Sequence, residues 1–248
     1  MKRIALVASQ KGEFGGLLKR VGAGHSLEGP LRYSRRVRSG EVEWLLYADG
    51  QGARAAERAC SAIQDAEDLW AMGSIGYCGA ARPEWRLGDV MLASQVRDRR
   101  NEQVYPCWAP PLAAGSIRMG SILTVERVVR LAADKRRIGQ SGVDAVEMEA
   151  AAVARVAKER GVPFFSLKAV SDTCEEDLVI DFERATREDG SVRVGSILAQ
   201  ALSRPLYRVP RLGRLANAAR LASENLGAAL AALFLAKGEN GSGDDGDS

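Results

Sequence analysis

The stretch VEMEAAAVARVAKERGVPFFSLKAVSD, residues 146–172, decides the fold class. Its start and its end are apolar runs typical of strands, and residues 149–160 between them have the composition and spacing of a helix. Gly161-Val162-Pro163 ends this helix, because glycine can adopt the left-handed conformation at a helix end. Proline has no N–H, but the first residue of a strand does not need one. Strand, helix and strand in succession indicate α/β architecture.

The same alternation continues outward from this stretch. Several of the apolar runs are apolar on both faces, as expected of a sheet covered by helices on both sides. The expected strands are residues 3–9, 42–49, 69–75, 89–96, 121–125, 144–148 and 164–170, and the expected helices are residues 53–64, 128–135, 149–160 and a segment after Ser191. We therefore predict an α/β fold over residues 1–205: a single-domain, three-layer sandwich with a mixed, largely parallel twisted sheet flanked by helices.

Composition is that of a globular chain with a sizeable core. The 248 residues are 46% hydrophobic and 27% charged, and the mean hydropathy is −0.16. No uninterrupted apolar run reaches the ~18 residues typical of a membrane-spanning helix, and the apolar run near the N-terminus is shorter than the ~7–15 residues of a signal-peptide core. We therefore expect a cytoplasmic protein.

Charge and rare residues narrow the chemistry. The net charge is 35 − 32 = +3, and the arginine clusters at positions 35, 36 and 38 and at 97, 99 and 100 suit either a solvated loop face or a phosphate contact. No nucleic-acid-reading motif accompanies them. Four cysteines without metal-ligand spacing indicate a reducing compartment, and the single histidine, His25, argues against Ser-His-Asp, Cys-His and histidine-rich metal sites. We expect no metal, no other cofactor and no nucleic-acid partner.

The C-terminal segment has a different pattern. Leucines and alanines at spacings of three and four, with arginines between them, predict an amphipathic helix over residues 211–236 within an extension spanning residues 206–236. Such a helix either packs on the body or on a partner subunit, for which we expect a homodimer, or lies on a membrane surface with its basic face toward the headgroups. The acidic tail, residues 237–248, is expected to be disordered.

Three acidic segments follow apolar strands. Glu13 comes soon after the first strand, Glu147 and Glu149 end the strand at 144–148, and Asp172 ends the strand at 164–170. Each acid alone could cap a helix, where a carboxylate complements the helix dipole. In an open α/β sheet, however, ligands bind at the carboxyl ends of the strands, so the convergence of these acids predicts a site there.

The motifs at these strand ends resemble a known family. Val146-Glu147-Met148-Glu149-Ala150, followed about twenty residues later by Lys168-Ala169-Val170-Ser171-Asp172, is similar to the paired signature of the purine nucleoside phosphorylase and methylthioadenosine/S-adenosylhomocysteine nucleosidase superfamily. The glycine loops at 50–52 and 76–79 and the segment at 86–90 match in order. The resemblance covers about residues 1–200 and implies a nucleoside phosphorylase-like fold that cleaves an N-glycosidic bond.

The resemblance also implies roles, and the chemistry fits them. Cleavage builds positive charge on the ribose and negative charge on the leaving base, so the base needs a general acid; Asp172 is the candidate, delivering a proton to purine N7, with Ser171 orienting it. Glu149 would accept from both ribose hydroxyls, and Met148 would pack under the sugar. Glu13 matches the family's water-activating glutamate.

The remaining positions of the implied site are Val128 and Val129 beside the base and Gly76 and Tyr77 in the pocket around the anomeric carbon. Several depart from the family pattern: Tyr77 stands where nucleosidases have a small or hydroxyl residue, the two valines where an aromatic is usual, and Gln10 where an apolar residue lies near the sugar. The general acid and the ribose contacts are unaffected, whereas the identity of the substrate is open.

Several functions remain as alternatives. The absence of arginine from loops 10–16 and 76–81 favours hydrolysis of a 5′-substituted adenosine over phosphorolysis. Arg54 remains as a cation that could bind phosphate. In having a C-terminal amphipathic helix, the chain resembles the hopanoid-associated branch of this superfamily, whose substrate is an adenosyl group on a polycyclic lipid. A non-catalytic nucleoside-binding relative is a further alternative. A dinucleotide-dependent dehydrogenase is disfavoured, because Gly73-Ser74-Ile75-Gly76 lacks the G-x-G-x-x-G order.

Overall fold

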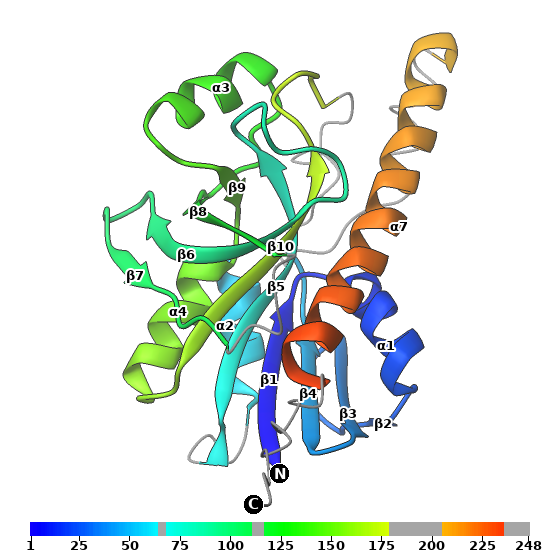
Figure 1. Cartoon of the computed structure of the whole chain (residues 1–248), viewed down its shortest axis with the longest axis vertical. Coiled ribbons are helices and arrows are strands. Elements are labelled where there is room, and N and C mark those ends of the chain that lie inside the picture. The colour runs from blue at the N-terminus through cyan, green and yellow to red at the C-terminus, as the bar shows by residue number, and fades with distance from the viewer. Residues whose placement is uncertain (64–67, 111–116, 179–204, 236–248) are drawn as a thin grey trace, which may run out of the picture.

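The structure is a computed structural model that describes residues 1–63, 68–110, 117–178 and 205–235 (Figure 1). Side chains are described for all of these except residues 205–212. The expected helix after Ser191, as far as residue 204, and the expected disordered tail at 237–248 lie outside the described residues.

Four parallel strands form the centre of the sheet. They lie in the order β4 (Val42–Ala48), β1 (Lys2–Ala8), β5 (Ala71–Ala80) and β10 (Phe164–Asp172), each hydrogen-bonded in parallel to the next. Antiparallel strands β3 (Tyr33–Ser39) and β2 (His25–Ser26) extend the sheet beyond β4. The carboxyl ends of β1, β5 and β10 therefore meet at one edge.

Beyond β5 the sheet closes on itself. β10 pairs with β6 (Val90–Asp98), β6 with β8 (Arg118–Thr124), β8 with β9 (Ala145–Glu147), and β9 returns to the end of β5. A short strand, β7 (Val104–Pro106), pairs with β6.

Gly76 marks the point at which β5 changes partners. Residues 71–74 of β5 pair with β1, and residues 79–80 pair with β9. Between them Gly76 has a φ of 136°, which favours glycine and bends the strand. This bend lets one long strand belong to both the open and the closed part of the sheet.

Helices cover both faces of the central strands. Helices α2 (Ala53–Ser61) and α4 (Ala150–Glu159) pack on the face to which Ala5 and Val7 of β1 point. Helices α1 (Gly15–Val21) and α7 (Pro205–Leu235) lie side by side on the other face (Figure 1). Burial on both faces explains the unbroken apolar strands, and the predicted α/β fold with a mixed sheet flanked by helices is confirmed.

One predicted helix begins later than expected. Instead of residues 128–135, helix α3 spans Ala132–Gln140, because Leu131 before it is extended, with φ −83° and ψ 132°. The Asp177 carboxylate accepts a hydrogen bond from the Ala132 N–H at 2.7 Å, so the first turn is capped from a distant loop rather than by its own sequence. Val128 and Val129 are therefore not helical. The sequence did not predict strand β3, the short strands β2 and β7, helix α1 or the 3₁₀ turn Lys11–Phe14.

The C-terminal helix packs on the body of the protein. Within the described residues, Gly213–Leu235 is long and apolar enough to cross a membrane, but half of its most apolar window is buried inside the protein. Ala222, Leu226 and Leu230 are fully buried in the core that also contains Phe165. Of the two alternatives that the sequence left open for this helix, these side chains therefore show packing on the body of the protein.

Candidate active site

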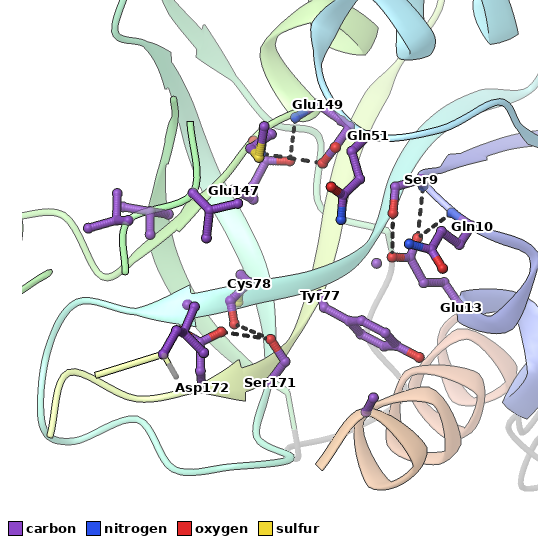
Figure 2. A pocket seen from close by; sticks show the side chains of 18 of the residues that line it. Ser9, Gln10, Glu13, Gln51, Tyr77, Cys78, Glu147, Glu149, Ser171 and Asp172 are labelled. Carbon is purple, nitrogen blue, oxygen red and sulfur yellow. Dashed lines mark hydrogen bonds between the residues drawn. The ribbon is translucent and has the colours of Figure 1, made fainter. Parts of the chain in front are cut away.

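All nine residues implied by the sequence line one cavity of about 340 Å³ at the carboxyl edge of the sheet (Figure 2). They are Glu13, Gly76, Tyr77, Val128, Val129, Met148, Glu149, Ser171 and Asp172. Figure 2 shows Glu13 and Tyr77 on one side, Ser171 and Asp172 on another, and Glu149 with Gln51 on a third. The tertiary structure therefore brings together segments that are far apart in the chain.

Glu13 is a buried carboxylate held beside the bend in β5. Ser9 donates to it twice, from its backbone N at 2.8 Å to Oε2 and from its hydroxyl at 2.7 Å to Oε1. A Cβ at Gly76 would lie 2.8 Å from Oε2, so only glycine leaves room for the carboxylate. Burial raises the pKa of Glu13 above its usual value, although the Ser9 hydrogen bonds and the Lys168 charge oppose this shift.

Glu147 is saturated by the protein. Its carboxylate accepts from the Thr124 hydroxyl at 2.5 Å and from the Ala150 N–H at 2.9 Å, and it forms an ion pair with Lys168 at 2.9 Å. Lys168 also donates to the Ser74 hydroxyl at 3.0 Å. Burial lowers the pKa of Lys168. The surrounding carboxylates raise this pKa by more than burial lowers it, so the net shift is upward. This pair is a buried, internally compensated part of the wall.

Glu149 keeps acceptor capacity for a ligand. Its Oε1 accepts from the Gly52 N–H at 2.7 Å, and its Oε2 has only a 3.3 Å contact from the Met148 N–H. Burial, and then the neighbouring charge of Glu147, raises the pKa of Glu149 to about 7. An ionised carboxylate has about four lone-pair positions, so this group can accept further hydrogen bonds from the cavity.

Asp172 lies at the end of β10, against β5. The Ser171 hydroxyl donates to its Oδ1 at 2.9 Å, and the ammonium group of Lys135, from α3, forms an ion pair with its Oδ2. A Cβ at Gly79 would lie 2.8 Å from Oδ2, so the carboxylate rests on the glycine backbone of β5. Asp172 therefore faces the cavity with a buried cation behind it.

Tyr77 fills part of the cavity next to Glu13. Burial, and then the Glu13 charge, raises the pKa of the phenol to about 12, while a hydrogen bond with Ser223 of α7 opposes the shift. The Ser223 hydroxyl also donates to the Gly12 carbonyl at 2.9 Å and accepts from the Gly16 N–H at 3.2 Å. The C-terminal helix thus holds the segment that carries Glu13.

The rest of the lining is mostly apolar. Its apolar residues are Ile75, Val125, Val128, Val129, Val146, Met148, Leu178, Leu215, Ala216 and Ala219, and Gln10, Gln51 and Cys78 are polar neighbours among them. Among the described residues, no lysine or arginine lines this cavity, and no group of three or more His, Cys, Asp or Glu side chains is arranged to hold a metal ion. Arg54 lines a different cavity, beside α2.

Sequence reasoning missed several residues of this site. Lys135 lies 37 positions before Asp172, and Ser223 lies 207 positions after Gly16, so no local spacing points to them. Lys168 is part of the quoted motif, but only its contact with Glu147 shows its role in the wall.

Comparisons with known proteins bear on the family and the fold. Residues 2–203 match the family model of the Phosphorylase superfamily. A comparison with curated protein sequences finds no significant match.

Three solved structures illustrate the similarity of fold. Futalosine hydrolase of Helicobacter pylori is 15% identical with a TM-score of 0.67, covering 94% of this chain and 97% of that one. The 5′-methylthioadenosine/S-adenosylhomocysteine nucleosidase of Campylobacter jejuni is 18% identical with a TM-score of 0.64, covering 93% and 99%. The S-adenosylhomocysteine nucleosidase of Streptococcus pyogenes is 19% identical with a TM-score of 0.58, covering 91% and 97%.

Proposed function

Because the chain belongs to the Phosphorylase superfamily, we propose that it cleaves the N-glycosidic bond of a purine nucleoside, and that it does so by hydrolysis. The observation that carries this proposal is the placement of three carboxylates, Glu13, Glu149 and Asp172, around one cavity with an apolar lining. Such a cavity can hold a base and a sugar, with one carboxylate for each chemical task.

Two of the carboxylates flank the position of the scissile bond in this proposal. Glu13 rests on Gly76 and Asp172 on Gly79, three residues further along β5. Asp172 would pass a proton to purine N7, and Glu13 would take a proton from the attacking water. The water would attack the anomeric carbon from the face of the sugar opposite the purine, as in inverting glycosidases.

The ribose contact is assigned to Glu149 rather than Glu147. Glu147 is already paired with Lys168, whereas Glu149 keeps acceptor positions toward the cavity. A carboxylate that accepts from both ribose hydroxyls binds more strongly as positive charge builds on the ring. Met148 would pack against the sugar, and Ser171, Val128 and Val129 would contact the base.

Charge favours water over phosphate as the nucleophile. No cationic side chain of the described residues lines the cavity, and Glu13 would repel a phosphate dianion. Tyr77 further reduces the space beside Glu13 that an anion of this size would need. Phosphorolysis is therefore the alternative reaction, and hydrolysis is the reaction that the charges of the cavity favour.

The substrate class in this proposal is a 5′-substituted adenosine. The apolar lining from Val125 to Ala219 suits a substituent of low polarity, either a thioether, as in methylthioadenosine and S-adenosylhomocysteine, or an adenosyl hopanoid-like lipid. We further propose that the enzyme is cytoplasmic and homodimeric. When its substrate is lipid-linked, it would touch a membrane through the side of the segment 211–236 that does not pack on the body.

Product analysis tests the function. The protein is incubated with adenosine, inosine and 5′-methylthioadenosine, with and without saturating phosphate, and purine, ribose and ribose-1-phosphate products are quantified. We expect purine release with a free ribose product in both buffers, lost in Glu13→Gln and retained in the matched control Glu41→Gln, which changes an exposed carboxylate. Strict dependence on phosphate would establish phosphorolysis instead.

A second candidate function is nucleoside binding without turnover, because Tyr77 occupies space in which a nucleophile would sit. Calorimetric binding of the same nucleosides without release of purine from any of them would establish this alternative. It would also remove the catalytic roles given to Glu13 and Asp172.

A further inference from the structure

Lys135, the fully buried lysine that pairs with Asp172, has no part in the proposed reaction so far. Its side chain has a relative exposure of 0%, and it pairs with the Asp172 carboxylate and donates to the Thr173 carbonyl at 3.0 Å. It does not line the cavity itself. A buried ammonium group is costly unless it is paired, so this contact is a specific feature of the fold.

The pairing creates a chemical problem for a general acid. An acid must carry a proton when the substrate binds, yet an adjacent ammonium group stabilises the ionised form of a carboxyl group. The two Asp172 oxygens are both engaged, Oδ1 by the Ser171 hydroxyl and Oδ2 by Lys135. Asp172 therefore lies between the ammonium group of Lys135 and the cavity.

We propose that the Lys135–Asp172 pair, rather than the Asp172 carboxyl group alone, holds the proton that passes to the leaving purine. This inference rests on the proposed function. Lys135 acts through Asp172 and is a positioning and proton-supplying residue, because its ammonium group lies behind the carboxylate and does not reach the cavity.

The proton and electron balance is complete within the pair and the substrate. As the bond between the ribose and N9 breaks, its electron pair stays with the purine, and a proton moves from Asp172 to N7. A proton moves in turn from the Lys135 nitrogen to Oδ2, so the pair ends as a carboxylate and a neutral amine. The proton that water loses on attack is taken up by Glu13, and solvent restores the proton of Lys135 after release of the products.

The groups around the pair come from several elements. Cys78 on β5 faces Asp172, and burial, followed by the Asp172 charge, raises the pKa of this thiol. Glu147 on β9 is compensated by Lys168. The other charged side chains near Asp172 line the neighbouring cavity that it shares, and they are Arg86, Glu175, Glu176, Asp177 and Arg214.

A purely structural role for Lys135 is separable, because α3 is tied to the loop after β10 by other contacts. Arg136 donates to the Cys174 carbonyl at 2.6 Å, and Asp177 accepts from the Ala132 N–H at 2.7 Å. Both contacts remain when Lys135 is replaced. The loss of Lys135 should therefore change proton transfer more than the position of α3.

The test compares pH profiles of purine release for wild type, Lys135→Met and the matched control Lys158→Met, which changes an exposed lysine. In Lys135→Met only a carboxyl group can carry the proton, so the basic limb of kcat should move to lower pH by roughly 1–3 units. At pH 8 the rate should fall by at most ~10³-fold, which is the loss that a shift of about 3 pH units produces, and the loss relative to wild type at the same pH should shrink as the pH is lowered. Lys158→Met should follow wild type.

A double-mutant cycle provides the independent measurement. If the two residues work as one unit, Lys135→Met should cost little in an Asp172→Asn background. Additive losses, or a uniform fall in rate with an unshifted pH profile, would overturn the inference. If Lys135→Met does not fold, Lys135→Gln replaces it in the same comparison, because the amide keeps a polar group beside Asp172 but carries no proton that it can transfer. Absence of purine release by wild type at every pH would instead reject the proposed function, and the inference with it.

Discussion

At the scale of single residues, the site separates carboxylates of the same type by their partners. Glu147 and Glu149 lie two positions apart, yet the first is compensated by Lys168 and the second keeps acceptor positions toward the cavity. Glu13 and Asp172 each rest on a glycine of β5. Burial and neighbouring charge, rather than residue type, therefore decide which acid can do which task.

Replacing Asp172 with asparagine should preserve the fold and nearly abolish purine release. The amide accepts no proton from Lys135 and delivers none to N7, and loss of a general acid typically lowers the rate ~10²–10⁴-fold. Steady-state kinetics with the best nucleoside substrate measures the effect, with Asp134→Asn, which changes a half-exposed acid on α3, as the matched control. Activity within a few-fold of wild type would remove Asp172 from the acid role.

Protonation of Glu149 should control activity on the acid side. Its pKa is about 7, so below this pH the group gains a proton and loses acceptor capacity for the ribose hydroxyls. We expect kcat/KM to fall as the pH drops through 7, and we expect this limb to vanish in Glu149→Gln together with a loss of about 2–4 kcal/mol in transition-state stabilisation. Glu159→Gln, which changes an exposed acid at the end of α4, should keep the limb. An unchanged acid limb in Glu149→Gln would assign it to another group.

At the scale of elements, the crossing of α1 and α7 sets the position of the Glu13 segment. A Cβ at Gly227 would lie 2.0 Å from the carbonyl carbon of Gly16, so the two helices touch backbone to backbone. Ser223, one turn earlier on α7, bonds to Gly12 and Gly16 on either side of Glu13. Helix α7 thus supports one wall of the cavity as well as the core.

Gly227→Ala should destabilise the protein, because the methyl group has only backbone to displace. Overpacking of this kind typically lowers the free energy of unfolding by about 1–3 kcal/mol. Gly213 in the same helix has open space around it. Gly213→Ala should therefore raise the free energy of unfolding by about 0.5–1 kcal/mol, since alanine favours a helix. Urea unfolding of both variants checks the pair, and equal stabilities would contradict the close crossing.

At the scale of the whole molecule, α7 is part of the core. Its buried residues belong to the same hydrophobic cluster as residues of strands β1, β4 and β10, among them Ile4 and Phe165. A chain lacking this helix would expose the apolar face of those strands.

A chain ending at Pro210 should therefore fail to fold. It loses Leu226 and Leu230, both fully buried, and removing even part of a buried leucine costs about 2–5 kcal/mol out of a total of about 5–15. Circular dichroism and size-exclusion chromatography measure the outcome, with a chain ending at Leu235, which keeps all of α7, as the control. A soluble, folded and active chain ending at Pro210 would show that α7 is a separate appendage.

The sequence by itself determined the elements and the chemical groups. Apolar strands, the stop at Gly161-Val162-Pro163 and acids at strand ends are local patterns, because each depends on residues next to one another in the chain. They predicted the α/β fold and the acids at the strand ends, whereas the resemblance to a known family implied the full set of nine residues that line one cavity. They misplaced α3, whose first turn is capped by the distant Asp177.

Only the tertiary structure decided the partners of those groups. The pairing of Lys135 with Asp172, the contact of Ser223 with the Glu13 segment and the closure of the sheet from β9 to β5 join residues that no local spacing relates. Each depends on how helices and strands pack once both faces of the sheet are covered. Because the proton affinity of a buried group depends on such neighbours, the chemistry of the site was set by packing at long range, while its residues were set by the sequence.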